Sequence, residues 1–266
     1  MTRRVRAVIR AYGGHTLLEV TIAVALGVVV VAGTLAAYRS QRAAFASAAD
    51  AARIRDAGIN ALVLIGEQIQ MAGFEPVGWS GDAVGPPLFG CAGGRPVVAS
   101  GGFSCGALAG GSDGVAIRYV GDGQSTWPSA SGWVTDCLGQ AVGLPATVVV
   151  NAFHAKPGVS SGEPELYCEG SGNAGTAQPL VEGVERLRLR YWLDGAAQAV
   201  DASALAPGQW ARVVAVDLCA LARGGASSRR VRYVDCDGVQ VVAQDGRARQ
   251  AFWRHVAIRN RSGAAL

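Results

Sequence analysis

The hydrophobic positions divide the chain into a charge-free apolar segment, an amphipathic segment and a long region of short alternations. From Val20 to Ala37, 18 residues carry no charged side chain. At 1.5 Å per residue a helix of this length spans about 27 Å, close to the thickness of a bilayer core. The pattern predicts a transmembrane helix at about residues 18–37.

Beyond residue 50 the apolar positions follow the period of an amphipathic helix. One stripe contains Ile54, Ile59, Leu62, Ile65, Ile69 and Ala72. Gly73 suits a left-handed C-terminal cap, and Pro76 is the first proline of the chain. We therefore expect one helix over residues 15–73. At about 85 Å it is too long to pack wholly against one domain, so part of it must lie in a bilayer or among other helices.

In residues 74–266, apolar and polar positions alternate in short runs that are separated by Gly, Pro, Asp and Ser. This pattern predicts a β-rich globular domain and an α+β fold overall. Residues 78–112 and 155–178 are glycine-rich and loop-like. The predicted strands are Val115–Val120, Val148–Phe153, Glu185–Leu193, Arg212–Leu221, Arg230–Asp235, Val239–Ala243 and Phe252–Arg259.

The strand Glu185–Leu193 has two chemically different faces. Leu187, Leu189 and Tyr191 alternate with Arg186, Arg188 and Arg190. The arginine row is interpreted as a solvated strand face, with a partner-binding face as the alternative. Six tryptophans (Trp79, Trp127, Trp133, Trp192, Trp210 and Trp253) offer core packing or exposed anchors for partners.

The chain has 266 residues, of which 50% are hydrophobic and 17% charged, so it can bury one sizeable core. Arg3, Arg4, Arg6 and Arg10 account for the whole formal net charge of +4. The rest of the chain is formally neutral, which gives no support to nucleic-acid binding. Basic residues ahead of an apolar span indicate orientation instead, with the short N-terminal piece in the cytoplasm.

All cysteines lie beyond the apolar segment, and none forms a C-x-x-C motif typical of zinc or redox sites. An even number in an exported chain favours disulfides, for which fifteen connectivities are possible. The pairs that would close short loops are Cys91–Cys105, Cys137–Cys168 and Cys219–Cys236.

Glu19 stands just before the charge-free run, where a carboxylate costs a few kcal/mol unless it is paired or interfacial. One interpretation places it at the interfacial end of a plain signal anchor. The flanking residues favour another. After a short basic leader, Gly14-His15-Thr16-Leu17-Leu18-Glu19 resembles the processing site of type IV prepilins.

That resemblance implies cleavage by prepilin peptidase between Gly14 and His15, removal of residues 1–14 as a leader, and N-methylation of His15. Glu19 becomes the fifth residue of the mature chain, as in the family, whereas His15 stands where the family usually has Phe or another apolar residue. Residues at i and i+4 share a helix face, so Glu19 and the new amine form a charged cluster. In a helix bundle Glu19 can pair with the amine of a neighbouring subunit and set the register.

Stretches farther along the chain resemble PilW-type minor pilins, in which Cys137 and Cys168 match a recurrent pair. They include S-D-G-V-A-I-R-Y (112–119), T-D-C-L-G (135–139), L-Y-C (166–168) and R-H-V-A-I-R-N-R (254–261). The resemblance implies a structural subunit that helps prime type IV pilus assembly and is a candidate for the fibre tip. A J-type minor pseudopilin of a type II secretion system shares the N-terminal architecture and is the alternative.

The resemblance also implies location and partners. The chain is expected to cross the inner membrane once, to place its C-terminal domain in the periplasm, and to enter the pilus at the cell surface. Its expected partners are other minor pilins and the major pilin through N-terminal helix packing, the prepilin peptidase, the inner-membrane assembly platform, and a large tip adhesin.

Patterns that could mark an active site are weak. Gly158-Val159-Ser160-Ser161-Gly162 fits G-x-S-x-G, but a nucleophile elbow needs a strand before it and a helix after it. A membrane-anchored periplasmic hydrolase built on Ser160 is therefore a remote alternative. Asp235-Cys236-Asp237-Gly238 favours a β-turn over a calcium loop, and His15, His154 and His255 have no second ligand at i+3 or i+4. We expect no enzyme activity, metal or cofactor.

Overall fold

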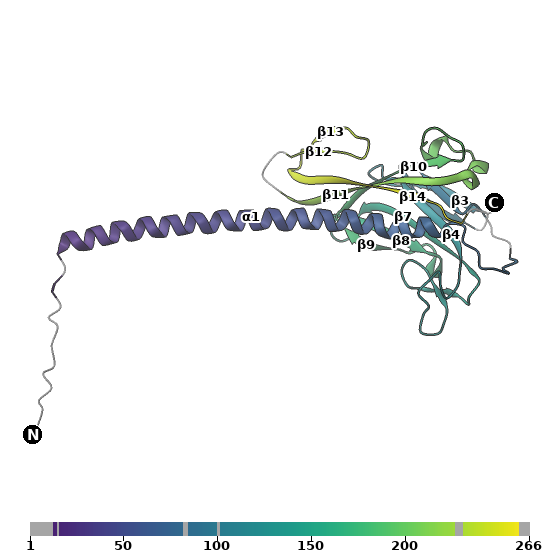
Figure 1. Ribbon diagram of the computed structural model, residues 1–266, viewed down its shortest axis with the longest axis horizontal. Coiled ribbons are helices and arrows are strands. Elements are labelled where there is room, and N and C mark those ends of the chain that lie inside the picture. The colour runs from purple at the N-terminus through teal and green to yellow at the C-terminus, as the bar shows by residue number, and fades with distance from the viewer. Residues whose placement is uncertain (1–12, 15, 82–84, 100–101, 227–230, 261–266) are drawn as a thin grey trace, which may run out of the picture. The chain divides into compact units, whose positions relative to one another are not determined.

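The computed structural model describes residues 13–14, 16–81, 85–99, 102–226 and 231–260. A single long helix, α1 (Leu17–Met71), is followed by a succession of β-strands (Figure 1). This confirms the predicted fold class, an N-terminal apolar helix followed by a β-rich, disulfide-bonded domain. The chain falls into two compact units that meet between Ala49 and Asp50, and each is described separately below.

The first unit contains residues 17–49 of α1. Thr16 caps the helix, because its Oγ1 accepts a hydrogen bond from the backbone N–H of Glu19 at 3.3 Å. Among the described residues, one helix, α1, is long and apolar enough to cross a bilayer. Its exposed apolar side chains include Leu17, Leu18, Val20, Ile22, Val24, Leu26, Val28, Val29, Val30, Val31 and Leu35.

The second unit is built from two antiparallel sheets and three hairpins. The larger sheet has the order β1-β4-β7-β8-β9 and the smaller one the order β10-β11-β14. The larger sheet consists of β1 (Leu88–Cys91), β4 (Gly114–Gly121), β7 (Thr147–Pro157), β8 (Pro164–Gly170) and β9 (Ala177–Glu182). The smaller sheet consists of β10 (Val184–Leu193), β11 (Val213–Ala226) and β14 (Arg247–Ala257).

The hairpins pair β2 (Gly94–Ala99) with β3 (Gly102–Ala107), β5 (Val134–Thr135) with β6 (Ala141–Gly143), and β12 (Arg232–Val234) with β13 (Gln240–Val242). Short 3-10 helices occupy Ser171–Asn173, Ala202–Ala204 and Pro207–Arg212.

Residues 50–71 of α1 supply one wall of the core of this second unit. Their buried side chains form one apolar cluster with residues of both sheets. Glycines allow the close approach, since a Cβ on Gly58 would lie 2.1 Å from the Phe252 ring of β14. The Arg254 guanidinium, also from β14, donates to the Leu62 carbonyl oxygen at 3.1 Å. The buried members of this helix face are Ile54, Ala57, Gly58, Ala61, Leu62, Ile65, Gly66 and Ile69.

We expect Gly58→Val to lower the free energy of unfolding of the second unit by about 1–3 kcal/mol, because the added side chain overlaps the Phe252 ring. Tryptophan fluorescence during urea unfolding measures this unit selectively, since every tryptophan lies beyond residue 78. Gly33→Val is the matched control in the same helix, where an added Cβ meets nothing within 4 Å. Equal urea midpoints for the two variants would contradict this packing.

The helix ends as its sequence predicts. Gly73 adopts a positive φ of 73°, and its backbone N–H donates to the Arg118 carbonyl oxygen of β4 at 2.9 Å. Backbone hydrogen bonds thus join the end of the helix directly to β4, which lies between β1 and β7 in the larger sheet. The observed helix, Leu17–Met71, is slightly shorter than the predicted 15–73, and His15 lies outside the described residues.

The seven predicted strands correspond to β4, β7, β10, β11, β12, β13 and β14, with small shifts at their ends. Arg230, the predicted start of one of them, lies outside the described residues. The loop-like interpretation of 78–112 and 155–178 was wrong in part, because the first contains β1, β2 and β3, and the second contains the end of β7 and all of β8. Glycines, prolines and cysteines interrupt the alternating pattern there, while backbone ladders and disulfides still hold the strands.

Candidate functional site

The predicted processing segment lies at the start of α1. Gly13 and Gly14 are exposed and precede the helix without regular structure. Residues 1–12 and His15 lie outside the described residues, so the cleavage site and the amine of His15 remain predictions. Glu19 occupies the third position of the helix and is exposed within its unit.

The position of Glu19 is electrostatically favourable. The first turn of a helix exposes unpaired backbone N–H groups and carries a partial positive charge, so a carboxylate there is stabilised. Thr16 and Glu19 have the spacing of a capping box, and the Thr16 hydroxyl accepts from the Glu19 N–H. This carboxylate therefore stands at one end of an exposed apolar helix, in a turn whose backbone favours negative charge.

The arginine row of β10 is paired with carboxylates in the second unit. Arg186 and Arg188 both bind Asp237, with N–O distances of 2.6 and 3.1 Å. Arg190 approaches Asp201 at 4.0 Å. The row is therefore partly solvated, in line with the first interpretation, and Arg190 is exposed. Its arginines also pair with carboxylates from other segments, which the strand pattern does not place.

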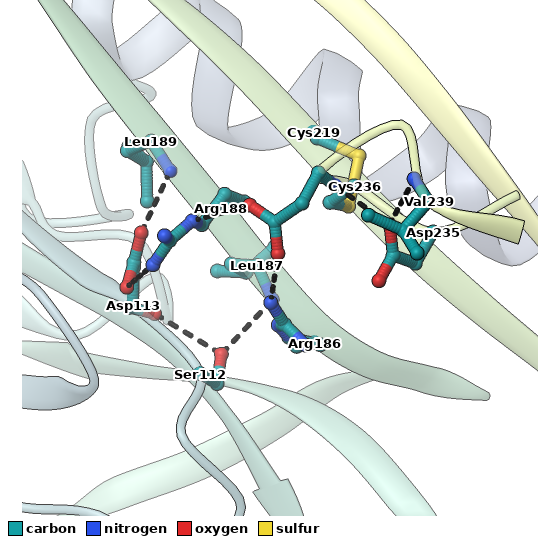
Figure 2. Close-up of a disulfide and its surroundings, with 11 residues drawn as sticks. Ser112, Asp113, Arg186, Leu187, Arg188, Leu189, Cys219, Asp235, Cys236 and Val239 are labelled. Atoms are coloured by element: carbon teal, nitrogen blue, oxygen red, sulfur yellow. Dashed lines mark hydrogen bonds and ion pairs between the residues drawn. A yellow bond between two sulfur atoms is a disulfide. The ribbon is translucent and has the colours of Figure 1, made fainter. Parts of the chain in front are cut away.

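Asp113 holds the two sheets together. Its carboxylate accepts hydrogen bonds from the backbone N–H of Gly93 at 2.8 Å and of Leu189 at 2.9 Å, and lies 3.5 Å from Arg188. Only 3% of Asp113 is exposed. The adjacent Ser112 accepts from the backbone N–H of Leu187 at 2.9 Å, so both side chains cap the free edge of β10 (Figure 2).

Three disulfides join Cys91 to Cys105, Cys137 to Cys168 and Cys219 to Cys236. These are the short-loop pairs considered from sequence. The third connects β11 to the turn after β12, beside the arginine row (Figure 2). In that turn Asp235 accepts from the backbone N–H groups of Asp237 and Val239, both at 2.9 Å. The turn is therefore organised by the Asp235 carboxylate, and the Gly238 N–H donates to the Asp235 carbonyl oxygen at 3.1 Å, in agreement with the predicted β-turn.

Catalytic geometry is not assembled around Ser160. This exposed residue lies in the turn that joins β7 to β8, so a strand follows where a nucleophile elbow requires a helix. The neighbouring Ser161 hydroxyl donates to Glu165 at 3.0 Å. Within the described part of the chain, no group of three or more His, Cys, Asp or Glu side chains could hold a metal ion.

The tryptophans divide between core and surface, which the sequence could not decide. Trp210 is buried against Phe89 and Tyr191. Trp127 is 91% exposed, and Trp253 is exposed on β14. The exposed rings are therefore available as contact residues, whereas Trp210 is part of the core.

Comparison with known proteins points to pili. Residues 155–260 match the model of the family described as Type IV Pilus-assembly protein W. The match confirms the PilW-type, type IV pilin-like recognition made from sequence. Among solved structures the chain is similar to the type IV-like pilin TTHA1219 from Thermus thermophilus, with 15% identity, a TM-score of 0.40, and coverage of 75% of this chain and 94% of that one. The search of curated proteins finds no match.

Proposed function

We propose that this PilW-type chain is a minor pilin that helps to prime type IV pilus assembly and is placed at the fibre tip. One observation carries the proposal: a helix with an exposed apolar N-terminal half and Glu19 in its first turn precedes a domain of which residues 155–260 match the pilus-assembly family. An exposed apolar helix of this length needs lipid or other helices as its surroundings. A pilus subunit is surrounded by lipid while it is in the membrane and by other helices once it is in the fibre.

Maturation begins in this proposal with cleavage between Gly14 and His15. The exposed Gly13-Gly14 pair lies ahead of the helix, where a peptidase can reach the backbone without unwinding a turn. Cleavage removes Arg3, Arg4, Arg6 and Arg10 together with the leader. Before that step their charge keeps the N-terminus in the cytoplasm and directs the C-terminal domain to the periplasm.

Glu19 then acts as the assembly contact. The ammonium group created at His15 lies near a helix end that already carries partial positive charge, so each mature subunit gains from a nearby carboxylate. In a helix bundle, Glu19 of an incoming subunit pairs with the ammonium of a neighbour. An apolar bundle penalises either charge strongly when its partner is missing, and the pair therefore selects one axial register.

Affinity purification of the tagged full chain from its native cells tests the proposed membership of the pilus. We expect the chain to co-purify with other minor pilins, the major pilin and the assembly platform, and its deletion to reduce surface pili. Recovery of secretion-system subunits instead, with normal piliation in the deletion strain, would assign the chain to a type II secretion pseudopilus and contradict the proposal.

A further inference from the structure

The buried imidazole of His154 has one ring nitrogen, Nε2, without a hydrogen-bond partner among the described residues. It lies on β7, opposite Tyr167 of β8, with the two rings stacked at 5.8 Å between centroids. Only 1% of His154 is exposed, and its Nε2 atom is enclosed without a partner among the described residues. Buried polar atoms in folded proteins are nearly always satisfied by protein, water or an ion, so this one calls for an explanation.

His154 lines a polar pocket of about 340 Å³ in the second unit. Lys156 shares its face of β7, because residues at i and i+2 of a strand point the same way. The Lys156 ammonium lies 4.3 Å from the centre of the Tyr167 ring. The remaining walls are Arg95 of β2, Glu169 of β8, Gly175 and Thr176 between η1 (Ser171–Asn173) and β9, and Ala177 at the start of β9.

The charged side chains that line the pocket are two cations, Arg95 and Lys156, and one carboxylate, Glu169. Glu169 is the carboxylate of the lining, and it already accepts from Arg95 at 3.3 Å and from the backbone N–H of Gly175 at 2.8 Å. Lys156 forms no ion pair among the described residues. Its ammonium lies over the Tyr167 ring, and Glu165, which accepts a hydrogen bond from the Tyr167 hydroxyl, lies opposite Lys156 on β8. Two cations thus share one carboxylate that is already engaged by two donors.

The pKa of the His154 imidazole is affected by these charges. Burial, as the largest cause, and the positive charges of Lys156 and Arg95 together lower the pKa of His154 to about 4. The groups near His154 are Arg95 from β2, Lys156 from β7, and Tyr167, Glu169 and Glu165 from β8, of which Glu165 is bound to the Tyr167 hydroxyl; the remaining lining residues are uncharged. Near neutral pH the imidazole is therefore neutral, and the pocket has two cations for one negative charge.

We propose that this pocket binds one anionic oxygen group, a carboxylate or a phosphate, between Lys156, Arg95 and His154. Lysine and arginine supply charged donors to such a group, and the Thr176 hydroxyl adds a neutral one. A cation is disfavoured, because the carboxylate of the lining is already engaged. The site is independent of the assembly role proposed for Glu19. It adds anion binding as a separate property of the second unit.

Binding is expected to depend on pH. A bound anion cancels the positive field, so the pKa of His154 is higher in the complex than in the free protein. By linkage, the complex takes up a proton, and affinity increases as the pH falls through the pKa of the complex toward that of the free protein. Above the pKa of the complex the affinity becomes constant, because the imidazole is then neutral in both states.

The test uses the full chain in detergent micelles with ¹³C-labelled histidine, titrated by NMR in inorganic phosphate, in acetate, and in chloride at the same ionic strength. We expect phosphate, acetate or both to raise the midpoint of the His154 signal by at least one pH unit above its value in chloride. One unit corresponds to about a tenfold gain in affinity at low pH. The arm that responds identifies a phosphate-bearing or a carboxylate-bearing ligand.

Substitutions locate the site. Lys156 is the only lysine of the chain, and Lys156→Gln is expected to weaken binding at least tenfold, while Lys156→Arg restores most of it. Arg232→Gln, which removes one exposed positive charge outside the pocket, is the charge-matched control and should bind as the parent does. An unchanged midpoint in both anions, or equal affinity of Lys156→Gln and Arg232→Gln, would overturn the proposal.

Discussion

Asp113→Ala is expected to lower the free energy of unfolding of the β-rich unit by about 3–5 kcal/mol, the range for removing one partner of a buried ion pair. The substitution leaves the backbone N–H groups of Gly93 and Leu189 without their acceptor and removes one of the two carboxylates that pair with Arg188, the other being Asp237. Each orphaned buried donor alone costs about 1–3 kcal/mol. Because Asp113 links β10 to the larger sheet, this loss affects the contact between the two sheets.

Urea unfolding of the full chain, followed by tryptophan fluorescence, measures this effect. Asp113→Asn preserves the shape and one acceptor oxygen, so an intermediate loss is expected. Asp237→Ala removes a carboxylate that binds Arg186 and Arg188 in a more exposed place, and should cost no more than about 1 kcal/mol. Equal losses for Asp113→Ala and Asp237→Ala would show that Asp113 does not hold the sheets together.

Glu19→Ala is expected to leave the leader cleaved and the β-rich unit folded, yet to reduce co-purification with partner pilins at least tenfold. The reason is that the ammonium of a neighbouring subunit loses its carboxylate inside an apolar bundle, where an uncompensated charge costs several kcal/mol. A factor of ten corresponds to only about 1.4 kcal/mol, so tenfold is a lower bound.

Quantitative immunoblotting of partner pilins recovered with each variant measures this loss. Glu19→Gln removes the negative charge but keeps nearly the same side-chain shape. It should reduce the recovery of partner pilins as much as Glu19→Ala does. Glu67→Ala is the control in the same helix, because Glu67 is an exposed carboxylate beyond the apolar half. Normal recovery with Glu19→Gln would exclude charge pairing as the function of this residue.

The helix could be predicted almost completely from sequence. A long charge-free run, a three-to-five residue apolar stripe and the Gly73 cap are local signals, and each is determined by neighbours along the chain. Strands with clear alternation, such as β10, were found for the same reason. The short strands β1, β2 and β3 were missed, because glycines, a proline and cysteines interrupt their alternation. β1 is held by its pairing with β4, and β2 and β3 by their mutual hairpin and the Cys91–Cys105 disulfide.

The polar contacts of the second unit could not be predicted in the same way. Asp113 lies 76 positions before Leu189, and Asp237 lies 49 positions after Arg188. Sequence alternation showed that the arginines share a face but not what covers them. The stretch S-D-G before β4 was part of the family resemblance, and an acid placed just before a fully buried strand was the one signal that could have singled out Asp113.

The intact mass of the mature chain tests the central claim most directly. The full-length chain is expressed in the membrane with and without an active prepilin peptidase, and both products are weighed by mass spectrometry. The account predicts that only the active peptidase removes residues 1–14, so that the product begins at His15. Gly14→Arg should block this loss while the chain still inserts. Identical masses in both cells, with residues 1–14 still attached, would contradict the account.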